Sequence, residues 1–116
     1  MSGNKKTIER YMDGFRNSDH EQILSCLTDD VVWRMPGAFD IVGKKAFDKE
    51  IENPAFQGRP DITVSRMIEE NDVVIAEGKV QAKRKDGGIL DAVFCDVFEM
   101  MNGKIRQLIS YLVEVK

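Results

Sequence analysis

The feature that most constrains the fold is a run of four long segments in the second half of the chain, in which apolar residues recur at every second position. Short turn signals separate these segments: Asn71-Asp72, Asp86-Gly87 and Asn102-Gly103. Asn, Asp and Gly tolerate the positive φ angles that tight hairpin turns require. Alternating apolar segments joined by such turns are typical of antiparallel strands. The sequence therefore predicts a meander of four strands from residue 61 to residue 115.

Helical spacing replaces this alternation in the first half of the chain. Residues 4–16 carry apolar side chains at positions i, i+3, i+4 and i+7, namely Ile8, Tyr11, Met12 and Phe15. This stripe predicts an amphipathic helix. Ser18 and Glu21 then match a capping box, which predicts the start of a second, shorter helix. A third short helix is predicted for residues 43–52, because Asn53-Pro54 ends the helical spacing there.

One more strand is predicted between the second and third helices. Val31, Trp33 and Met35 alternate with less apolar neighbours, so one face of this strand carries a large aromatic ring and a thioether. Pro36-Gly37 ends the strand, since proline has no N–H to donate to a neighbouring strand. We expect loops from there to Gly43 and again over residues 55–60. Helices followed by strands predict the α+β class, with helices covering one face of a mostly antiparallel sheet.

The last two predicted strands have apolar residues on both faces. Alternation places Leu90, Ala92, Phe94, Asp96, Phe98 and Met100 on one face of the first of them. On the second strand it places Ile105 on the same face as Gln107, Ile109, Tyr111 and Val113. An outer face in contact with water alone would be more polar. We therefore expect a homodimer formed through the outer face, with Val93, Val97, Ile109 and Tyr111 in the interface.

Composition limits the remaining possibilities. The 116 residues are enough for one domain with one core, which we assign to residues 1–116. The net charge of −3 comes from mixed acidic and basic residues, so no basic face for nucleic acid is expected. The two cysteines, Cys26 and Cys95, belong to no metal-binding pattern and are predicted to be buried thiols. With no signal peptide and no membrane-length apolar run, we expect a cytoplasmic protein that does not enter a membrane.

Two motifs give the chain a resemblance to a known superfamily: DDVVWRMPG at residues 29–37 and DVFEMMNGKI at residues 96–105. With the order of predicted elements, they resemble the nuclear transport factor two-like superfamily and its SnoaL-like branch. The resemblance implies a cone in which three N-terminal helices pack on a curved sheet, with an apolar pocket open at one end. The superfamily includes ketosteroid isomerase, polyketide cyclases, limonene epoxide hydrolase and non-catalytic binding modules, so fold membership alone does not decide the function.

The resemblance also implies roles for two residues. Tyr11 and Asp96 fall where ketosteroid isomerase places its two oxyanion-hole donors. Apolar neighbours of Asp96 are expected to raise its pKa and keep it protonated, as a donor must be. Met35 occupies the position of that enzyme's general base, and a thioether cannot accept a proton from carbon at neutral pH. The isomerase mechanism is therefore not expected, and a structural role for Tyr11 and Asp96 stays open.

We predict that the pocket holds a small hydrophobic ring or polyketide-like ligand, with Tyr11 and Asp96 as the candidate catalytic residues. The predicted lining residues are Phe15, Trp33, Met35, Phe39, Phe47, Phe94, Phe98, Met100, Leu108, Ser110 and Leu112. The alternative is a binding or structural module without turnover. No cofactor or metal is expected, because the only histidine, His20, lies in a helix-start turn. Ser110 has no histidine to activate it, and an epoxide hydrolase set of Asp, Arg and Asp lacks a clearly placed second acid beside Arg66 and Asp96.

Overall fold

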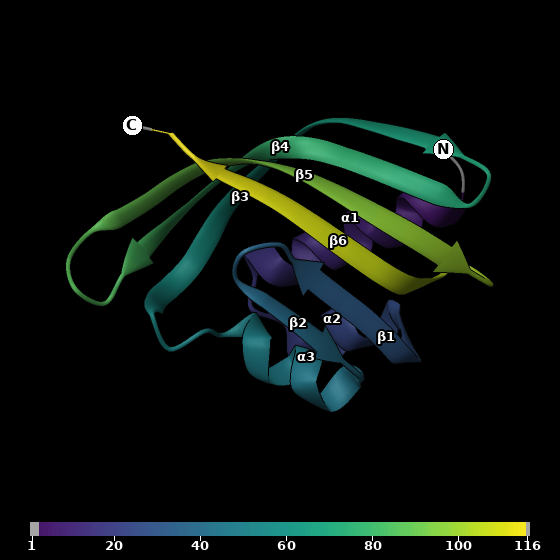
Figure 1. Ribbon diagram of the computed structural model, residues 1–116, viewed down its shortest axis with the longest axis horizontal. Coiled ribbons are helices and arrows are strands. Elements are labelled where there is room, and N and C mark those ends of the chain that lie inside the picture. The colour runs from purple at the N-terminus through teal and green to yellow at the C-terminus, as the bar shows by residue number, and fades with distance from the viewer. Residues whose placement is uncertain (1–2, 116) are drawn as a thin grey trace.

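Three helices pack against one strongly curved sheet of six strands in the computed structural model, which describes residues 3–115 (Figure 1). The elements in chain order are α1 (Gly3–Arg16), α2 (His20–Ser25), β1 (Leu27–Met35), β2 (Phe39–Val42), α3 (Lys44–Ile51), β3 (Phe56–Glu70), β4 (Val73–Arg84), β5 (Ile89–Met101) and β6 (Lys104–Glu114). The strand order across the sheet is β2-β1-β6-β5-β4-β3. The predicted α+β class and mostly antiparallel sheet are confirmed.

The four long strands form the predicted meander. Each of the pairs β3–β4, β4–β5 and β5–β6 is antiparallel, and only β1 and β6 run parallel. Positive φ angles at Asn71, Asp72, Asn102 and Gly103 show why the two-residue turns need these residue types. The parallel pairing brings β1 from the first half of the chain beside β6 from its end. Residues far apart in the sequence thereby meet on one sheet face.

The core lies between the helices and the concave face of the sheet. Ile8 of α1, Ile23 of α2 and Phe47 of α3 are fully buried. They pack against inward-facing residues of the strands, including Phe98 and Leu108. The alternation predicted for β5 is confirmed, because Leu90, Ala92, Phe94, Phe98 and Met100 are all buried. No helix within residues 3–115 is both long enough and apolar enough to cross a membrane.

Three local predictions are wrong. The capping residue of α2 is Asp19, whose side chain accepts a hydrogen bond from the Gln22 backbone N–H, while Ser18 adopts a positive φ of 51°. Part of the expected loop after Pro36-Gly37 is strand β2, which folds back on β1 and pairs Phe39 with Met35. Strand β3 begins at Phe56 instead of residue 61, because its first residues pair with the end of β4.

The prediction that Ile105 shares a sheet face with Gln107 and Ile109 is also wrong. The register between β5 and β6 shifts at the start of β6, where Met100 pairs with Ile105 and Glu99 with Gln107. The extra residue, Arg106, is a bulge, and a bulge reverses the alternation on one side of it. Ile105 therefore points into the core and is fully buried.

Candidate functional site

Two cavities share one apolar wall between α1 and the concave sheet face. The outer cavity has a volume of about 880 Å³ and the inner one of about 110 Å³. Residues that line both are Phe15, Trp33, Met35, Ile62, Val80 and Leu112. The inner cavity adds Tyr11, Met12, Phe94, Asp96 and Ser110, so its polar groups lie among apolar side chains. Such an arrangement, apolar walls with a few converging polar groups, is typical of small-molecule sites.

Asp96 is the acidic residue of the inner cavity. It lies on the inward face of β5, between the buried Phe94 and Phe98. Removal from water disfavours the carboxylate and raises the pKa of Asp96 to about 7, although hydrogen bonding with the Ser110 side chain opposes the shift. Near neutral pH, protonated and ionised forms of Asp96 are therefore both present.

Tyr11 lies opposite on α1 and lines the same inner cavity. Burial, and after it the neighbouring Asp96, holds the pKa of Tyr11 well above its ordinary value, so the phenol stays protonated. Within residues 3–115, its hydroxyl makes no hydrogen bond, and no fully enclosed side-chain oxygen or nitrogen lacks a partner. The Tyr11 hydroxyl therefore opens onto accessible space, where it is free to donate.

Trp33 forms much of the wall and makes a hydrogen bond across the site. Its indole N–H donates to Ser110 Oγ at 3.0 Å, and this bond is buried. Phe47 stacks on the indole from the core side, with ring centroids 4.4 Å apart. Phe39 and Phe15 meet the indole edge-on at 5.0 and 6.1 Å. The ring is thus held on several sides, which fixes the direction of its N–H.

The predicted site residues fall into two groups. Those that line at least one of the two cavities are Tyr11, Phe15, Trp33, Met35, Phe39, Phe94, Asp96, Ser110 and Leu112. The other four lie in the closed core, outside both linings: Phe47, Phe98, Met100 and Leu108. Phe47 supports the wall from behind through its stacking on Trp33. We therefore leave these four out of the site proposed below.

Sequence reasoning missed the part of the wall made by β3, β4 and the segment after α3. Ile62 and Val80 line both cavities, and residues 50–54 line the mouth of the outer one. The signal for Ile62 and Val80 was present in the period-2 pattern of their strands. The curvature that turns these residues toward α1 is not readable from that pattern.

His20 forms ion pairs beside the outer cavity. His20, at the start of α2, places Nδ1 2.6 Å from Asp48 and Nε2 3.1 Å from Glu52, and Glu52 also lines the cavity. Hydrogen bonding to Asp48 is the main cause that raises the pKa of His20. His20 lies at the start of α2, as predicted, and its ring joins α2 to α3 through these two contacts.

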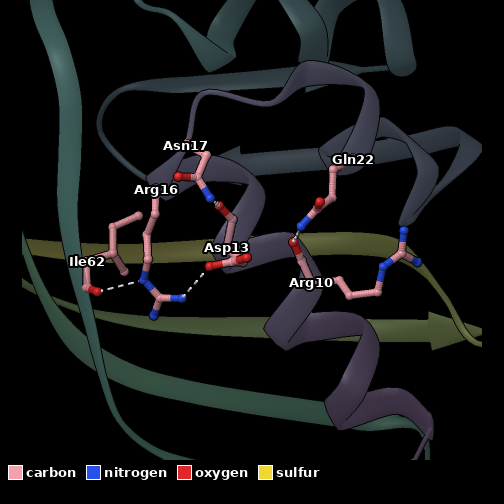
Figure 2. A network of polar contacts seen from close by, with 6 residues as sticks. All are labelled: Arg10, Asp13, Arg16, Asn17, Gln22 and Ile62. Carbon is pink, nitrogen blue, oxygen red and sulfur yellow. Dashed lines mark hydrogen bonds and ion pairs between the residues drawn. The ribbon is translucent and has the colours of Figure 1, made fainter.

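A third hollow, of about 680 Å³, lies on the surface between α1 and β3. Figure 2 shows that its polar side chains bond to nearby groups: Arg16 donates to the Ile62 carbonyl oxygen and pairs with Asp13, and Gln22 donates to the Arg10 carbonyl oxygen. The guanidinium groups of Arg10 and Arg66 are also engaged, with Ser25 and Glu77. Since these groups hold one another, the hollow is a weaker candidate for a binding site.

The titratable groups of the chain do not cluster as metal ligands do. Within the described residues, no three His, Cys, Asp or Glu side chains lie together in a group that could hold a metal ion. Both cysteines are free thiols, Cys26 buried and Cys95 partly buried. The site offers hydrogen-bond donation by Tyr11, and both donation and proton exchange by Asp96, within an apolar wall.

Comparison with known proteins identifies the family. The model of the SnoaL-like domain matches residues 8–108, and the chain belongs to that family. No curated protein was found to match the chain. Its structural relatives include NTF2-like, ketosteroid isomerase-like and SnoaL-like polyketide cyclase proteins, which confirms the resemblance seen in the sequence.

Three solved structures illustrate the similarity. An NTF2-like protein from Burkholderia pseudomallei superposes with a TM-score of 0.86 at 18% identity, covering 97% of this chain and 92% of that one. TerC, co-crystallised with polyporic acid, superposes with a TM-score of 0.84 at 22% identity, covering 98% of this chain and 92% of that one. An LEH-like epoxide hydrolase from M. tuberculosis superposes with a TM-score of 0.82 at 20% identity, covering 96% of this chain and 83% of that one. At these identities the similarity establishes the cone fold and leaves the ligand of this chain open.

Proposed function

We propose that this protein binds a small, mostly apolar ring compound whose carbonyl or hydroxyl oxygen lies in the inner cavity between Tyr11 and Asp96. The supporting observation is that two O–H donors of raised pKa line one small apolar cavity. A ring oxygen there accepts a hydrogen bond from each donor, while the outer cavity takes the rest of the ligand. TerC, a relative of the same fold, was crystallised with polyporic acid.

If the bound compound is a ketone or enone, the two donors would also polarise its carbonyl. Donors placed in a water-poor cavity stabilise negative charge that develops on oxygen, as an oxyanion hole does. A cyclase or isomerase reaction of this kind would use water as its proton acceptor, with a substrate acidic enough to lose its proton to water. Met35 cannot serve, because it lines the cavity at the position where ketosteroid isomerase has its base and offers only a thioether.

The second candidate is a binding module without turnover, and Met35 is the observation that favours it. The residue lines both cavities and offers only a thioether. Under this alternative, Tyr11 and Asp96 still hold the ligand oxygen. The two candidates therefore share one binding site and differ in whether the ligand is recovered chemically unchanged.

The binding claim is tested by thermal shift and calorimetry with a panel of phenols, cyclic enones and hydroxyquinones. We expect at least one ring compound to raise the melting temperature, because a ligand that binds only the folded state stabilises it. Tyr11→Phe removes one donor and should weaken binding about tenfold or more. Asp96→Asn replaces the carboxyl by an amide, which is a weaker donor, and should weaken binding by less. Recovery of the ligand, analysed by mass spectrometry, separates turnover from binding alone.

Matched controls are available within the chain. Tyr111→Phe makes the same change at the only other tyrosine, which is exposed on the outer sheet face. Asp91→Asn makes the same change on β5 but on the opposite face from Asp96. Both should bind as the parent protein does. Equal affinity in Tyr11→Phe, Asp96→Asn and their controls would contradict the proposed pose.

A further inference from the structure

We propose that Ser110, held in place by the indole N–H of Trp33, is a positioning residue that orients the Asp96 carboxyl toward the ligand. This inference rests on the proposed function, since it assigns Ser110 and Trp33 a part in preparing the same site. Ser110 is 4% exposed, so its hydroxyl is buried. A buried hydroxyl of this kind must have its hydrogen bonds satisfied from within the protein.

The sheet register places Ser110 directly opposite Asp96. The two residues pair across β5 and β6, and both line the inner cavity. Side chains that face each other across an antiparallel pair lie within about 4.5–5.5 Å at their Cβ atoms. The Asp96 carboxyl therefore has the Ser110 hydroxyl as its neighbour on β6.

Trp33 determines which way the Ser110 hydroxyl can point. A hydroxyl has one proton to donate and two lone pairs that accept. The indole N–H is a donor only, so at 3.0 Å it occupies an acceptor position of Ser110 Oγ. The Ser110 proton is then left to donate elsewhere, and the carboxylate of Asp96 is the acceptor beside it. Trp33, Ser110 and Asp96 thus form a directed chain of donors ending on the carboxylate.

Two further elements, α1 and β4, also face Asp96. Tyr11 on α1 is the titratable group that faces Asp96 from the helix layer, and its raised pKa keeps it neutral. On the other side, β4 presents Ala76 opposite Asp96, which adds no polar group. With one carboxyl oxygen held by Ser110, the other faces the cavity and, in the neutral form, carries the proton that is donated to the ligand oxygen.

The hydrogen bonds that link Trp33, Ser110 and Asp96 affect the ionisation of the Asp96 carboxyl. Donation from Ser110 favours the ionised form of Asp96, whereas burial favours the neutral form. The balance keeps both forms populated near neutral pH. Without Ser110, Asp96 would remain a neutral donor to higher pH and would lose its fixed orientation.

The inference is tested by following the carboxyl carbon of Asp96 by NMR as a function of pH in the unliganded protein, with Asp96→Asn to assign the signal. Ser110→Ala should raise the pKa of Asp96 by about one unit, the size expected for losing one hydrogen bond to a charged group. Trp33→Phe keeps an aromatic ring but removes the N–H, and should give a smaller rise. Ser110→Thr keeps the hydroxyl and should restore the parent value.

Ser65→Ala, which removes an exposed hydroxyl on β3, is the matched control and should leave Asp96 unchanged. A folded Ser110→Ala protein with the parent pKa at Asp96 would overturn the inference. The titration uses no ligand, so it decides the role of Ser110 separately from the binding test. Loss of the proposed function would instead appear as equal ligand affinity in Asp96→Asn and Asp91→Asn.

Discussion

Asp96 is partly buried, and the loss of water around its carboxyl makes the stability of the fold depend on pH. Its pKa is about 7 in the folded protein and near 3.8 when unfolded, so the folded state binds more protons between these values. The contribution of Asp96 to stability is therefore complete below pH 3.8 and is lost as pH rises through 7. A position kept for function at a cost to stability is common in ligand sites.

Asp96→Asn should accordingly stabilise the protein, and more so at higher pH. Because Asn cannot ionise, its advantage over Asp in free energy of unfolding should grow by roughly 2–3 kcal/mol between pH 5 and pH 8. Urea denaturation at both pH values measures this change. Asp91→Asn is the control and should show no such growth. A constant difference between Asp96→Asn and the parent protein would argue that the Asp96 carboxyl is solvated.

Gly78 is a second residue whose identity is determined by its surroundings. It lies in β4 beside β3, and a Cβ atom there would come within 2.0 Å of the Thr63 carbonyl oxygen and 2.9 Å of the Phe94 ring. Gly78→Ala should therefore destabilise the fold by about 1–3 kcal/mol, because backbone must move to admit the methyl group. Urea denaturation tests this, with Gly3→Ala as the control, since Gly3 has open space around it. A loss no larger than that of Gly3→Ala would refute the close approach.

At the scale of elements, the junction between α2 and α3 contains the only histidine of the chain. The pKa of His20 is raised above 6.5, chiefly by Asp48, so its stabilising effect is complete below pH 6.5 and is lost as pH rises through the folded value. His20→Gln should therefore destabilise the protein at pH 6 and have little effect at pH 9, as measured by thermal unfolding.

The partners of His20 give an internal check. Asp48→Asn removes the group that contributes most to the raised pKa of His20, and should reproduce the pH dependence of His20→Gln. Combining the two substitutions should add little, because they remove the same interaction. An equal loss of stability at pH 6 and pH 9 in His20→Gln would mean that packing, and not charge, joins α2 to α3 through this ring.

Elements differ in how far the sequence predicted them. The long strands were predictable because their turns depend on local residue types, as positive φ at Asn71 and Asn102 shows. Strand β2 was not, because its four residues form a strand only by pairing with β1. The bulge that turns Ile105 inward likewise depends on how β6 aligns with β5. Register between distant segments is a tertiary property that periodicity does not encode.

For the site, the sequence predicted the positions of single residues but not the contacts between them. Alternation placed Asp96 and Ser110 on their strand faces, and helical spacing placed Tyr11 on the buried side of α1. The bond between Trp33 and Ser110 was not predictable, since the two residues are 77 positions apart. Their contact depends on the parallel pairing of β1 with β6.

At the scale of the whole molecule, the outer sheet face remains without a partner in the described chain. Val93, Tyr111 and Val113 are 40%, 48% and 60% exposed there. We propose that two copies pair through this face, because neighbouring exposed apolar side chains on a sheet favour association. Sedimentation at micromolar concentration should then give twice the mass of 13.2 kDa.

Val93→Glu should shift this equilibrium to the monomer, since two charges would be buried in the interface. Lys6→Glu is the control, because Lys6 is exposed on α1, in the helix layer on the other side of the sheet. A parent protein that sediments with the mass of one chain would contradict the proposed dimer.

The ligand-binding role proposed for the cone depends most on the protonation state of the Asp96 carboxyl in the inner cavity. The direct measurement is the NMR titration of the Asp96 carboxyl carbon in the parent protein. The structure predicts a midpoint at about pH 7, together with a change in that midpoint when a ring compound from the binding panel is added. A midpoint near 3.8, unaffected by every such compound, would contradict the proposed site.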